Sequence, residues 1–205
     1  CLGCQKELSY DAENTQICGD CFAKIRLNRG AQYQKNTALK AVFAAGRYDD
    51  PILREAVKSF KYQSIESLKK PLAKLAIDYL KKENLASAFS GFVITPIPLT
   101  LRRKLNRGFN QSELLAEEIG AFLNCPVVNL LKRKKFNFPQ AEIPDWQKRK
   151  ENITGVFELI DVGHLYNKII LVDDVSTSGA TLEEAASVLK QAGIKEIYGL
   201  VIAKG

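Results

Sequence analysis

The sequence is poor in several residue types, and each shortage excludes a class of function. Its 205 residues include one histidine, one tryptophan and no methionine. His164 has no second histidine with which to share a metal ion or a proton, so we expect no histidine-dependent mechanism and interpret it as a surface loop residue. No apolar run approaches the ~20 residues of a membrane-spanning helix. With no recognisable secretory signal, the sequence predicts a cytoplasmic location and no membrane insertion.

The composition is otherwise that of a globular protein with an excess of positive charge. Hydrophobic residues make up 46% and charged residues 26% of the chain, whose formal net charge is +7. Basic residues are concentrated in 100–108, which contains no acid, and in 132–150. Such blocks either attract polyanions or keep the surface solvated, and composition leaves both interpretations open.

Four of the five cysteines form two C-x-x-C pairs separated by 13 residues. Two such pairs can complete a tetrahedral Zn²⁺ site, whose ligands would be Cys1, Cys4, Cys18 and Cys21. Two disulfides or a redox dithiol are the alternatives. The segment has few large apolar side chains, so we expect it to fold around a structural Zn²⁺. Gly3 and Gly19 lie inside the pairs, where we expect tight backbone turns. Cys125 is interpreted as a buried small residue.

Short apolar runs and helically spaced apolar residues predict the order of elements along the rest of the chain. We expect strands at 38–48, 91–98, 127–128, 169–173 and 197–203, and helices from Pro51 and over 68–82, 112–122 and 181–192, with a long loop at 132–152. This order predicts an α/β fold in which a parallel sheet carries helices on both faces, in three α/β/α layers. A polar connector near 28–36 divides a zinc ribbon, 1–36, from the larger domain, 37–205.

The segment IILVDDVSTSGAT, residues 169–181, carries the clearest functional pattern. A buried strand ends in Asp173 and Asp174, and a loop of small and hydroxyl residues leads into a helix. Ligands of open α/β sheets bind at the carboxyl ends of the strands. Such a loop can direct N–H groups at a phosphate, whereas the two carboxylates suit sugar hydroxyls or a hydrated Mg²⁺. The segment therefore predicts a site for a phosphorylated sugar.

At every position this segment resembles the 13-residue signature of phosphoribosyltransferases that use phosphoribosyl pyrophosphate (PRPP). The resemblance implies a phosphoribosyltransferase fold, with Asp173 and Asp174 as the catalytic pair on the ribose hydroxyls and Mg²⁺ bound together with PRPP. It also implies that the following loop binds the 5-phosphate, through Ser176, Thr177, Ser178, Gly179, Ala180 and Thr181.

The segment 96–111, PIPLTLRRKLNRGFNQ, follows another predicted strand and is rich in arginine. Guanidinium groups suit the oxygens of a diphosphate. Alone, the segment could equally be a basic loop before a helix; beside the PRPP signature we expect it to bind PRPP. The residues expected to do so are Leu99, Thr100, Arg102, Arg103, Arg107 and Gln111.

The block PIPL…RR…RGFNQSELLA resembles the ComF family of competence proteins, which are similar to amidophosphoribosyltransferases. Its members combine a four-cysteine zinc ribbon, this block, a basic loop and the PRPP signature, so the resemblance covers nearly the whole chain. It implies a role in DNA uptake, with PRPP and single-stranded DNA as partners, and possible contacts with other DNA-uptake or recombination proteins. By similarity to better-known phosphoribosyltransferases, a flexible loop would close over the ligand, using Lys134, Lys135, Gln140 and Asn152.

Three functions remain open at this point. The chain could be a phosphoribosyltransferase acting on an unknown acceptor, a DNA-uptake factor, or a regulator that senses PRPP without turnover. No glutaminase half is recognisable, so we do not expect amidophosphoribosyltransferase activity. Phe136, Phe138 and Trp146 lie near the basic stretch 132–150 and could stack on the bases of single-stranded DNA.

Overall fold

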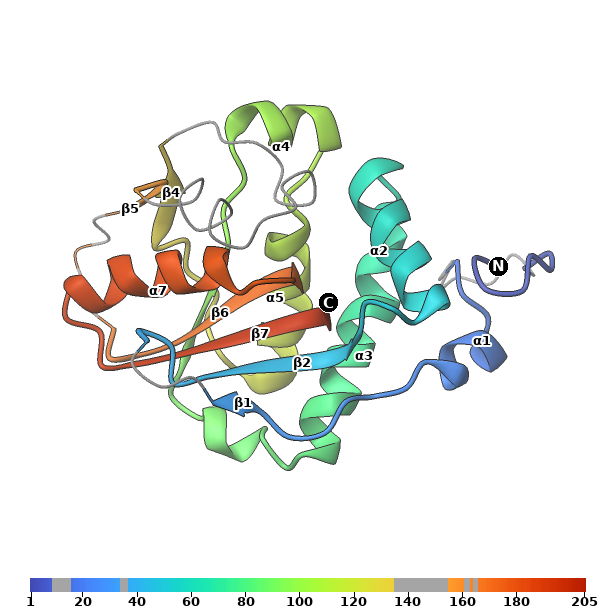
Figure 1. The fold of residues 1–205 in the computed structure, drawn as a ribbon, viewed down its shortest axis with the longest axis horizontal. Helices are drawn as coiled ribbons and strands as arrows, with labels where there is room; N and C mark the ends of the chain where they lie inside the picture. The colour runs from blue at the N-terminus through green and yellow to red at the C-terminus, as the bar shows by residue number, and fades with distance from the viewer. Residues whose placement is uncertain (9–15, 34–36, 135–154, 161–162, 164–165) are drawn as a thin grey trace.

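A computed structural model describes residues 1–205 except 9–15, 34–36, 135–154, 161–162 and 164–165 (Figure 1). Its central sheet has the strand order β1-β2-β7-β6-β3. The strands are β1 (Gln32–Tyr33), β2 (Ala41–Arg47), β7 (Glu196–Lys204), β6 (Lys168–Ser176) and β3 (Val93–Pro96). β2, β7, β6 and β3 are parallel, and β1 is antiparallel to β2. The predicted α/β class with a mostly parallel sheet is confirmed.

Helices cover both faces of the sheet because successive strand residues point to opposite sides. On β6, Ile170 and Val172 belong to a core shared with three helices, whereas Ile169 and Leu171 pack in a second core with α7. The helices are α2 (Pro51–Tyr62), α3 (Lys69–Lys82) and α5 (Gln111–Leu123) on one face, and α7 (Ala180–Gln191) on the other. Figure 1 shows the resulting three layers.

Local capping explains where these helices begin. The Asp50 carboxylate accepts hydrogen bonds from the backbone N–H groups of Ile52 and Leu53, both at 3.0 Å, and Pro51 occupies the first turn of α2. Asn110 caps α5 in the same way. α7 follows Gly179, whose φ of 79° lies in the left-handed region that favours glycine.

Several elements differ from the prediction. The expected loop after residue 100 contains a short helix, α4 (Leu101–Arg107). β4 (Leu131–Arg133) pairs with β5 (Phe157–Leu159) in a separate two-stranded sheet, so the start of the predicted loop 132–152 is a strand and a second strand follows the loop. The expected strand at 127–128 is a single bridge from Val127 to Ile94. Short 3₁₀ turns at Glu66–Leu68 and Ser87–Phe89 complete this part of the chain.

The N-terminal segment packs against the helices on the α3 side of the sheet. It contains α1 (Gly19–Lys24), and Ile17, Cys21 and Ile25 share a core with α2 and α3. The Tyr79 hydroxyl donates a hydrogen bond to the carbonyl oxygen of Gly30. β1 also lies before residue 36 and pairs with β2. The domain boundary after residue 36 stays a prediction.

The connections that follow β3 and β6 run to opposite sides of the sheet, so a crevice forms between the carboxyl ends of these two strands. These strands are neighbours, with Pro96 opposite Val172. After β3 the chain passes through α5 to Val127, on the far side of β3 from β6. After β6 it passes through α7, on the opposite face, to β7. Ligands of open α/β sheets bind at such a switch point. Among the described residues, no helix has the length and apolar character needed to cross a membrane.

Candidate functional site

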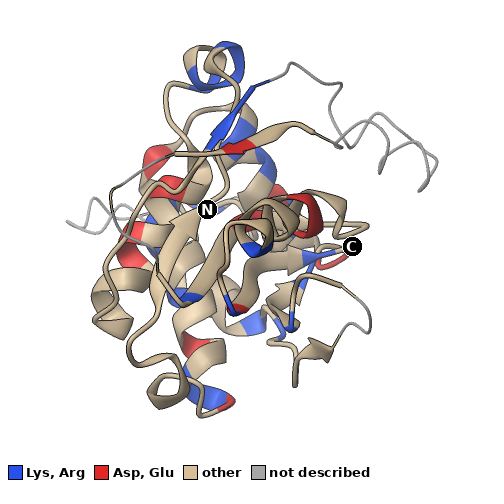
Figure 2. Ribbon diagram, turned by 90° about the vertical axis from the view of Figure 1, so that its left-hand side faces the viewer, with Lys and Arg blue, Asp and Glu red and all other residues tan. Residues whose placement is uncertain are grey.

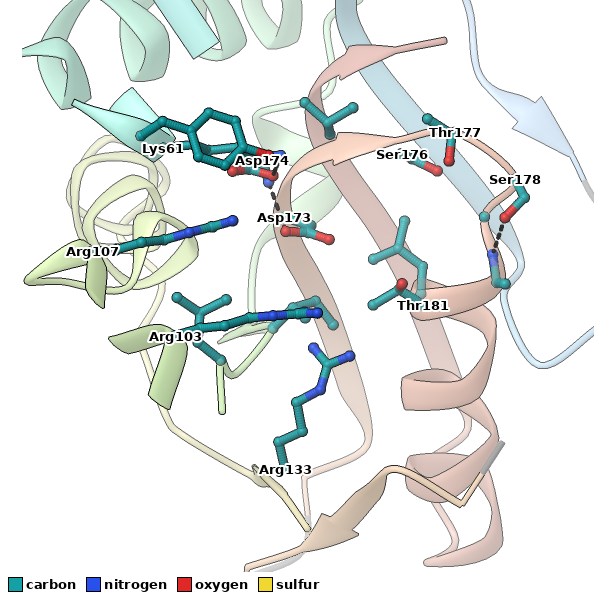
Figure 3. Close-up of a pocket in the computed structure, with 17 residues that line it drawn as sticks. Lys61, Arg103, Arg107, Arg133, Asp173, Asp174, Ser176, Thr177, Ser178 and Thr181 are labelled. Atoms are coloured by element: carbon teal, nitrogen blue, oxygen red, sulfur yellow. Dashed lines mark hydrogen bonds and ion pairs between the residues drawn. The ribbon is translucent and has the colours of Figure 1, made fainter. Parts of the chain in front are cut away.

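A pocket of about 200 Å³ opens at the carboxyl ends of β3 and β6 (Figure 3). Most of the predicted PRPP-binding residues line it: Leu99, Arg103, Arg107, Asp173, Asp174, Ser176, Thr177, Ser178, Gly179, Ala180 and Thr181. Thr100, Arg102 and Gln111 do not line it. Lys135, Gln140 and Asn152 of the predicted flexible loop lie outside the described residues. The fold thus brings together two segments of sequence that were predicted to share a ligand.

The two carboxylates are held by different partners. Asp173 Oδ1 accepts a hydrogen bond from Ser112 Oγ at 3.0 Å and one from the backbone N–H of Asp174 at 2.9 Å. Asp174 is buried, and its Oδ1 lies 3.0 Å from Nζ of Lys61. Burial, reinforced by the charge of Asp174, raises the pKa of Asp173 to about 7, although Lys61 opposes this shift. The pair therefore shares less than two negative charges near neutral pH.

Lys61, Tyr62 and Arg133 line the pocket but were not predicted as site residues. Lys61 and Tyr62 end α2, whose amphipathic pattern indicated only a helix packed on the core. The sequence signal that could have found them is that Phe60-Lys61-Tyr62 resembles the segment after the first core helix of ComF proteins. Arg133 belonged to the basic block at 132–150, and its position on β4 depends on pairing with β5.

A wall of guanidinium groups faces the acidic pair. Arg103 and Arg107 are four residues apart on α4 and so share one helix face, whereas Arg102 is exposed. In Figure 3 these two arginines and Arg133 point into the pocket from the side opposite Ser178 and Thr181. Burial, and the nearby charge of Arg103, lower the pKa of Arg133 to about 10, which leaves it charged at neutral pH.

Gln111 holds one of these arginines in place from outside the pocket. Its buried side chain accepts a hydrogen bond from Arg107 Nη1 and donates one to the carbonyl oxygen of Phe60, both at 3.1 Å. The Arg107 guanidinium also lies 5.4 Å from the centre of the Tyr62 ring. Gln111 therefore positions Arg107, and Thr100 similarly caps α4 by accepting a hydrogen bond from the backbone of Arg103.

The opposite wall consists of the loop after β6 and the start of α7. β6 extends through Ser176, three residues beyond the predicted strand. Ser178 Oγ accepts from the backbone N–H of Ala180 at 3.4 Å, and α7 begins directly after Gly179. The first residues of a 12-residue helix thus line the pocket, where their N–H groups favour an anion. With four cations and two carboxylates lining it, the pocket favours a polyanion.

The predicted loop begins at a hairpin whose lysines form ion pairs. Lys134 Nζ lies 3.3 Å and Lys132 Nζ 3.2 Å from the two oxygens of Glu158. Neither lysine lines the pocket. Figure 2 shows Lys and Arg on both α4 and β4 at the top of the molecule. The described part of the basic block therefore supplies Arg133, not Lys134, to the pocket.

The acidic pair was expected to suit sugar hydroxyls or a hydrated Mg²⁺, and the donor set there does not fit inner-sphere binding of Mg²⁺ by Asp174. Carboxylate oxygens are good Mg²⁺ ligands. However, Asp174 already pairs with Lys61, and one oxygen of Asp173 accepts two hydrogen bonds. A second cation against Asp174 would meet the repulsion of the lysine ammonium.

The four N-terminal cysteines form a cluster. The Sγ atoms of Cys1, Cys4, Cys18 and Cys21 all lie within 4.8 Å of one another. All four are free thiols, which argues against two disulfides. The backbone N–H of Cys18 also points at the sulfur of Cys1, at 3.3 Å. A cluster of this kind could hold a metal ion such as Zn²⁺.

Of the two glycines inside the C-x-x-C pairs, only Gly3 has neighbours that leave no room for a side chain. A Cβ atom on Gly3 would lie 2.6 Å from Cys21 Sγ, so this position must lack a side chain. Gly19 begins α1, and a Cβ there would meet nothing within 4 Å. Neither glycine has a positive φ. The expected tight turn is confirmed at Gly3, where the backbone N–H of Gln5 donates to the carbonyl oxygen of Cys1 at 2.8 Å, and is wrong at Gly19, which begins a helix.

The chain is similar to bacterial proteins named for competence and DNA utilization. It is 28% identical to Competence protein F of Haemophilus influenzae, over 99% of this chain and 90% of that protein. It is 28% identical to Competence protein ComFC of Streptococcus pneumoniae, over 96% and 77% of the two chains. DNA utilization protein YhgH of Salmonella typhimurium is 28% identical, over 94% and 85%. No family model matches the chain. The similarity extends over both the cysteine cluster and the pocket.

Proposed function

Because the chain belongs to the ComF family, we propose that it is a cytoplasmic protein of natural competence and DNA uptake that binds PRPP. The names of its relatives support the role in competence. We further propose that its α/β sheet is a phosphoribosyltransferase fold and that residues 1–36 form a zinc ribbon. The parallel sheet and the four-cysteine cluster support these two proposals.

The distribution of charge along the pocket is the observation that carries the proposal. PRPP has a phosphate at one end, a diphosphate at the other and hydroxyl groups between them. The pocket has a hydroxyl-rich loop and a helix start on one wall and three arginines on the other, with the acidic pair between (Figure 3). In this arrangement the loop 177–181 binds the 5-phosphate, Asp173 and Asp174 bind ribose hydroxyls, and the arginines bind the diphosphate. Mg²⁺ accompanies the diphosphate as part of the ligand.

Catalysis of phosphoribosyl transfer to an unknown acceptor is the second candidate function. The arginine wall supports it, because three guanidinium groups near a diphosphate would stabilise the negative charge that develops on a leaving group. Release of pyrophosphate on adding an acceptor distinguishes this enzyme from a regulator that senses PRPP without turnover.

Single-stranded DNA is the proposed partner at the rim of the pocket. Arg102 and Lys104 lie on the exposed part of α4, where they can contact phosphates. Tyr62 is 67% exposed at the pocket mouth and offers a ring on which a base can stack. Other DNA-uptake or recombination proteins are further proposed partners.

Binding of PRPP measured by calorimetry tests the ligand. The double variant Asp173→Asn/Asp174→Asn should lose binding, because two carboxylate acceptors for ribose hydroxyls become amides. Asp78→Asn is the matched control, since Asp78 forms an exposed ion pair with Lys74 on α3, away from the pocket. Equal affinity of the double variant and the natural chain would contradict the proposed site.

Binding of a labelled oligonucleotide at several salt concentrations tests the DNA partner. Neutralising Arg102 and Lys104 should reduce the slope of log affinity against log salt by about 0.7 for each phosphate that the protein no longer neutralises. If the natural chain binds no single-stranded DNA even at low salt, this part of the proposal is wrong.

A further inference from the structure

Lys61 forms the most enclosed lysine–carboxylate ion pair among the described residues. Its Nζ lies 3.0 Å from Asp174 Oδ1, and the two side chains are 18% and 7% exposed. The other lysine–carboxylate pairs of the described residues each include at least one side chain that is 45% exposed or more. Desolvating two charges costs free energy that their attraction only partly offsets, so a buried pair inside a pocket calls for a functional explanation.

The end of α2 that carries Lys61 is anchored by burial and by a hydrogen bond. Leu53, Val57 and Phe60 of α2 are fully buried in the core. The carbonyl oxygen of Phe60, the residue before Lys61, accepts the hydrogen bond from Gln111. The last turn of α2 is thereby tied to the start of α5. The point from which the Lys61 side chain extends is therefore fixed at the edge of the pocket, within reach of Asp174.

The charge of Lys61 is preserved in this setting. Burial by itself would lower the pKa of the ammonium, but the attraction of Asp174 and Asp173 outweighs it and raises the pKa above its usual value. Arg107 is the cation that opposes this shift. An ammonium group is a compact cation with three donors, so it can neutralise Asp174 while still donating to an oxygen of a ligand.

We propose that Lys61 is a tethered cation that takes the place of a divalent metal ion at the acidic pair, so that Asp174 binds its ligand without coordinating metal. The identity of the ligand as a phosphorylated sugar rests on the proposed function, but the exclusion of metal concerns the free protein. Any Mg²⁺ then enters bound to the phosphate oxygens of the ligand, on the arginine side of the pocket.

Direct titration with Mn²⁺, followed by electron paramagnetic resonance, tests this exclusion on the full chain with Zn²⁺ in its cysteine site. The natural chain should bind no Mn²⁺ at the pocket. Lys61→Met removes the tethered charge and should bind one Mn²⁺, with an affinity at least about tenfold above the weakest binding that the titration detects, because a +1 neighbour no longer repels the ion. Adding Asp174→Asn to Lys61→Met should abolish the new binding and so assign it to the acidic pair.

Two further variants separate the charge of Lys61 from its packing. Lys61→Arg keeps the cation and should exclude Mn²⁺ as the natural chain does. Lys74→Met removes the exposed partner of Asp78 and should create no Mn²⁺ site. If Lys61→Met does not unfold cooperatively, Lys61→Gln takes its place, with a rise in the midpoint of thermal unfolding on adding Mn²⁺ as a second measurement.

The proposal is overturned if the natural chain binds Mn²⁺ at the pocket as tightly as Lys61→Met does. It is equally overturned if a folded Lys61→Met or Lys61→Gln variant acquires no Mn²⁺ site. Neither result depends on PRPP, so failure of the proposed ligand would be seen in calorimetry with PRPP and not in the metal titration.

Discussion

Ser112 donates a hydrogen bond from its hydroxyl to Asp173, 61 residues later in the chain, at 3.0 Å. Ser112 lies in the first turn of α5, and Asp173 lies near the end of β6. This contact ties a helix start to the carboxyl edge of the sheet. Together with the Lys61–Asp174 pair, it gives each carboxylate a fixed partner from a different helix.

The first prediction concerns this hydrogen bond. Ser112→Ala should lower the free energy of unfolding by about 1–3 kcal/mol, because a carboxylate loses a buried donor. Ser59→Ala is the matched control: Ser59 is fully buried, and its Oγ has no hydrogen-bond partner among the described residues, so the change should be neutral or stabilising. Urea unfolding measures both. Equal losses in the two variants would show that the hydrogen bond contributes nothing.

The second prediction separates two adjacent arginines. Arg103→Ala should weaken PRPP binding about tenfold or more, because Arg103 lines the pocket and hydrogen bonds to charged groups contribute about 1.5–3 kcal/mol. Arg102→Ala should change PRPP affinity far less, since Arg102 is exposed and outside the pocket. Calorimetry with both variants measures the two losses of PRPP affinity. A larger loss in Arg102→Ala than in Arg103→Ala would contradict the assignment of Arg103 to the PRPP-binding side of the pocket.

The third prediction concerns pH. The pKa of Asp173 is about 7 in the folded protein, against about 3.9 in an unfolded chain. The folded state therefore binds more protons between these values, and the free energy of unfolding from this group falls as pH rises from about 4 to about 7. Asp173→Asn should lack that fall and, without ligand, should be more stable than the natural chain at pH 8. Chemical unfolding at several pH values in this range measures the free energy of unfolding of both proteins. If this free energy depends on pH in the same way in Asp173→Asn and in the natural chain, the raised pKa of Asp173 is refuted.

The fourth prediction concerns the cysteine cluster. Cys4→Ser should lower the bound Zn²⁺ and cost several kcal/mol of stability, because metal binding contributes directly to the folding of such segments. Cys125→Ala is the control, because Cys125 is buried and lies more than 100 residues after the cluster in the sequence. This substitution should lower the free energy of unfolding by about 1 kcal/mol and leave the metal content unchanged. Metal analysis and thermal unfolding distinguish the two. Full Zn²⁺ occupancy in Cys4→Ser would exclude the four-thiolate site.

Elements with a strong local pattern were predicted well. The strand at 169–173 was predicted from an apolar run, and the helix at 181–192 from helically spaced apolar residues; the structure adds that Gly193, directly after this helix, has a φ of 95°. α4 was missed for a physical reason. Its Leu101 and Leu105 are more than 70% exposed, so no apolar stripe marks it, and its ends depend on a Thr100 cap and on Gly108.

Short strands that pair only with distant segments were also missed. β4 and β5 have three residues each, and each depends on the other, across more than twenty intervening residues. Three residues carry too little periodicity to predict a strand. The same pairing places Arg133 in the pocket, which explains why a general basic block was recognised but its one pocket residue was not.

The sequence by itself determined the chemistry that adjacent residues carry: four thiols in two close pairs, two carboxylates near the end of a buried strand, and a hydroxyl loop before a helix. These depend on spacing of a few residues, which backbone geometry translates directly into neighbouring side chains. Only the tertiary structure decided which cations face the carboxylates. Lys61, Arg103 and Arg133 come from three elements that meet only when the sheet and its helices pack, because buried apolar area, not local sequence, brings those elements together.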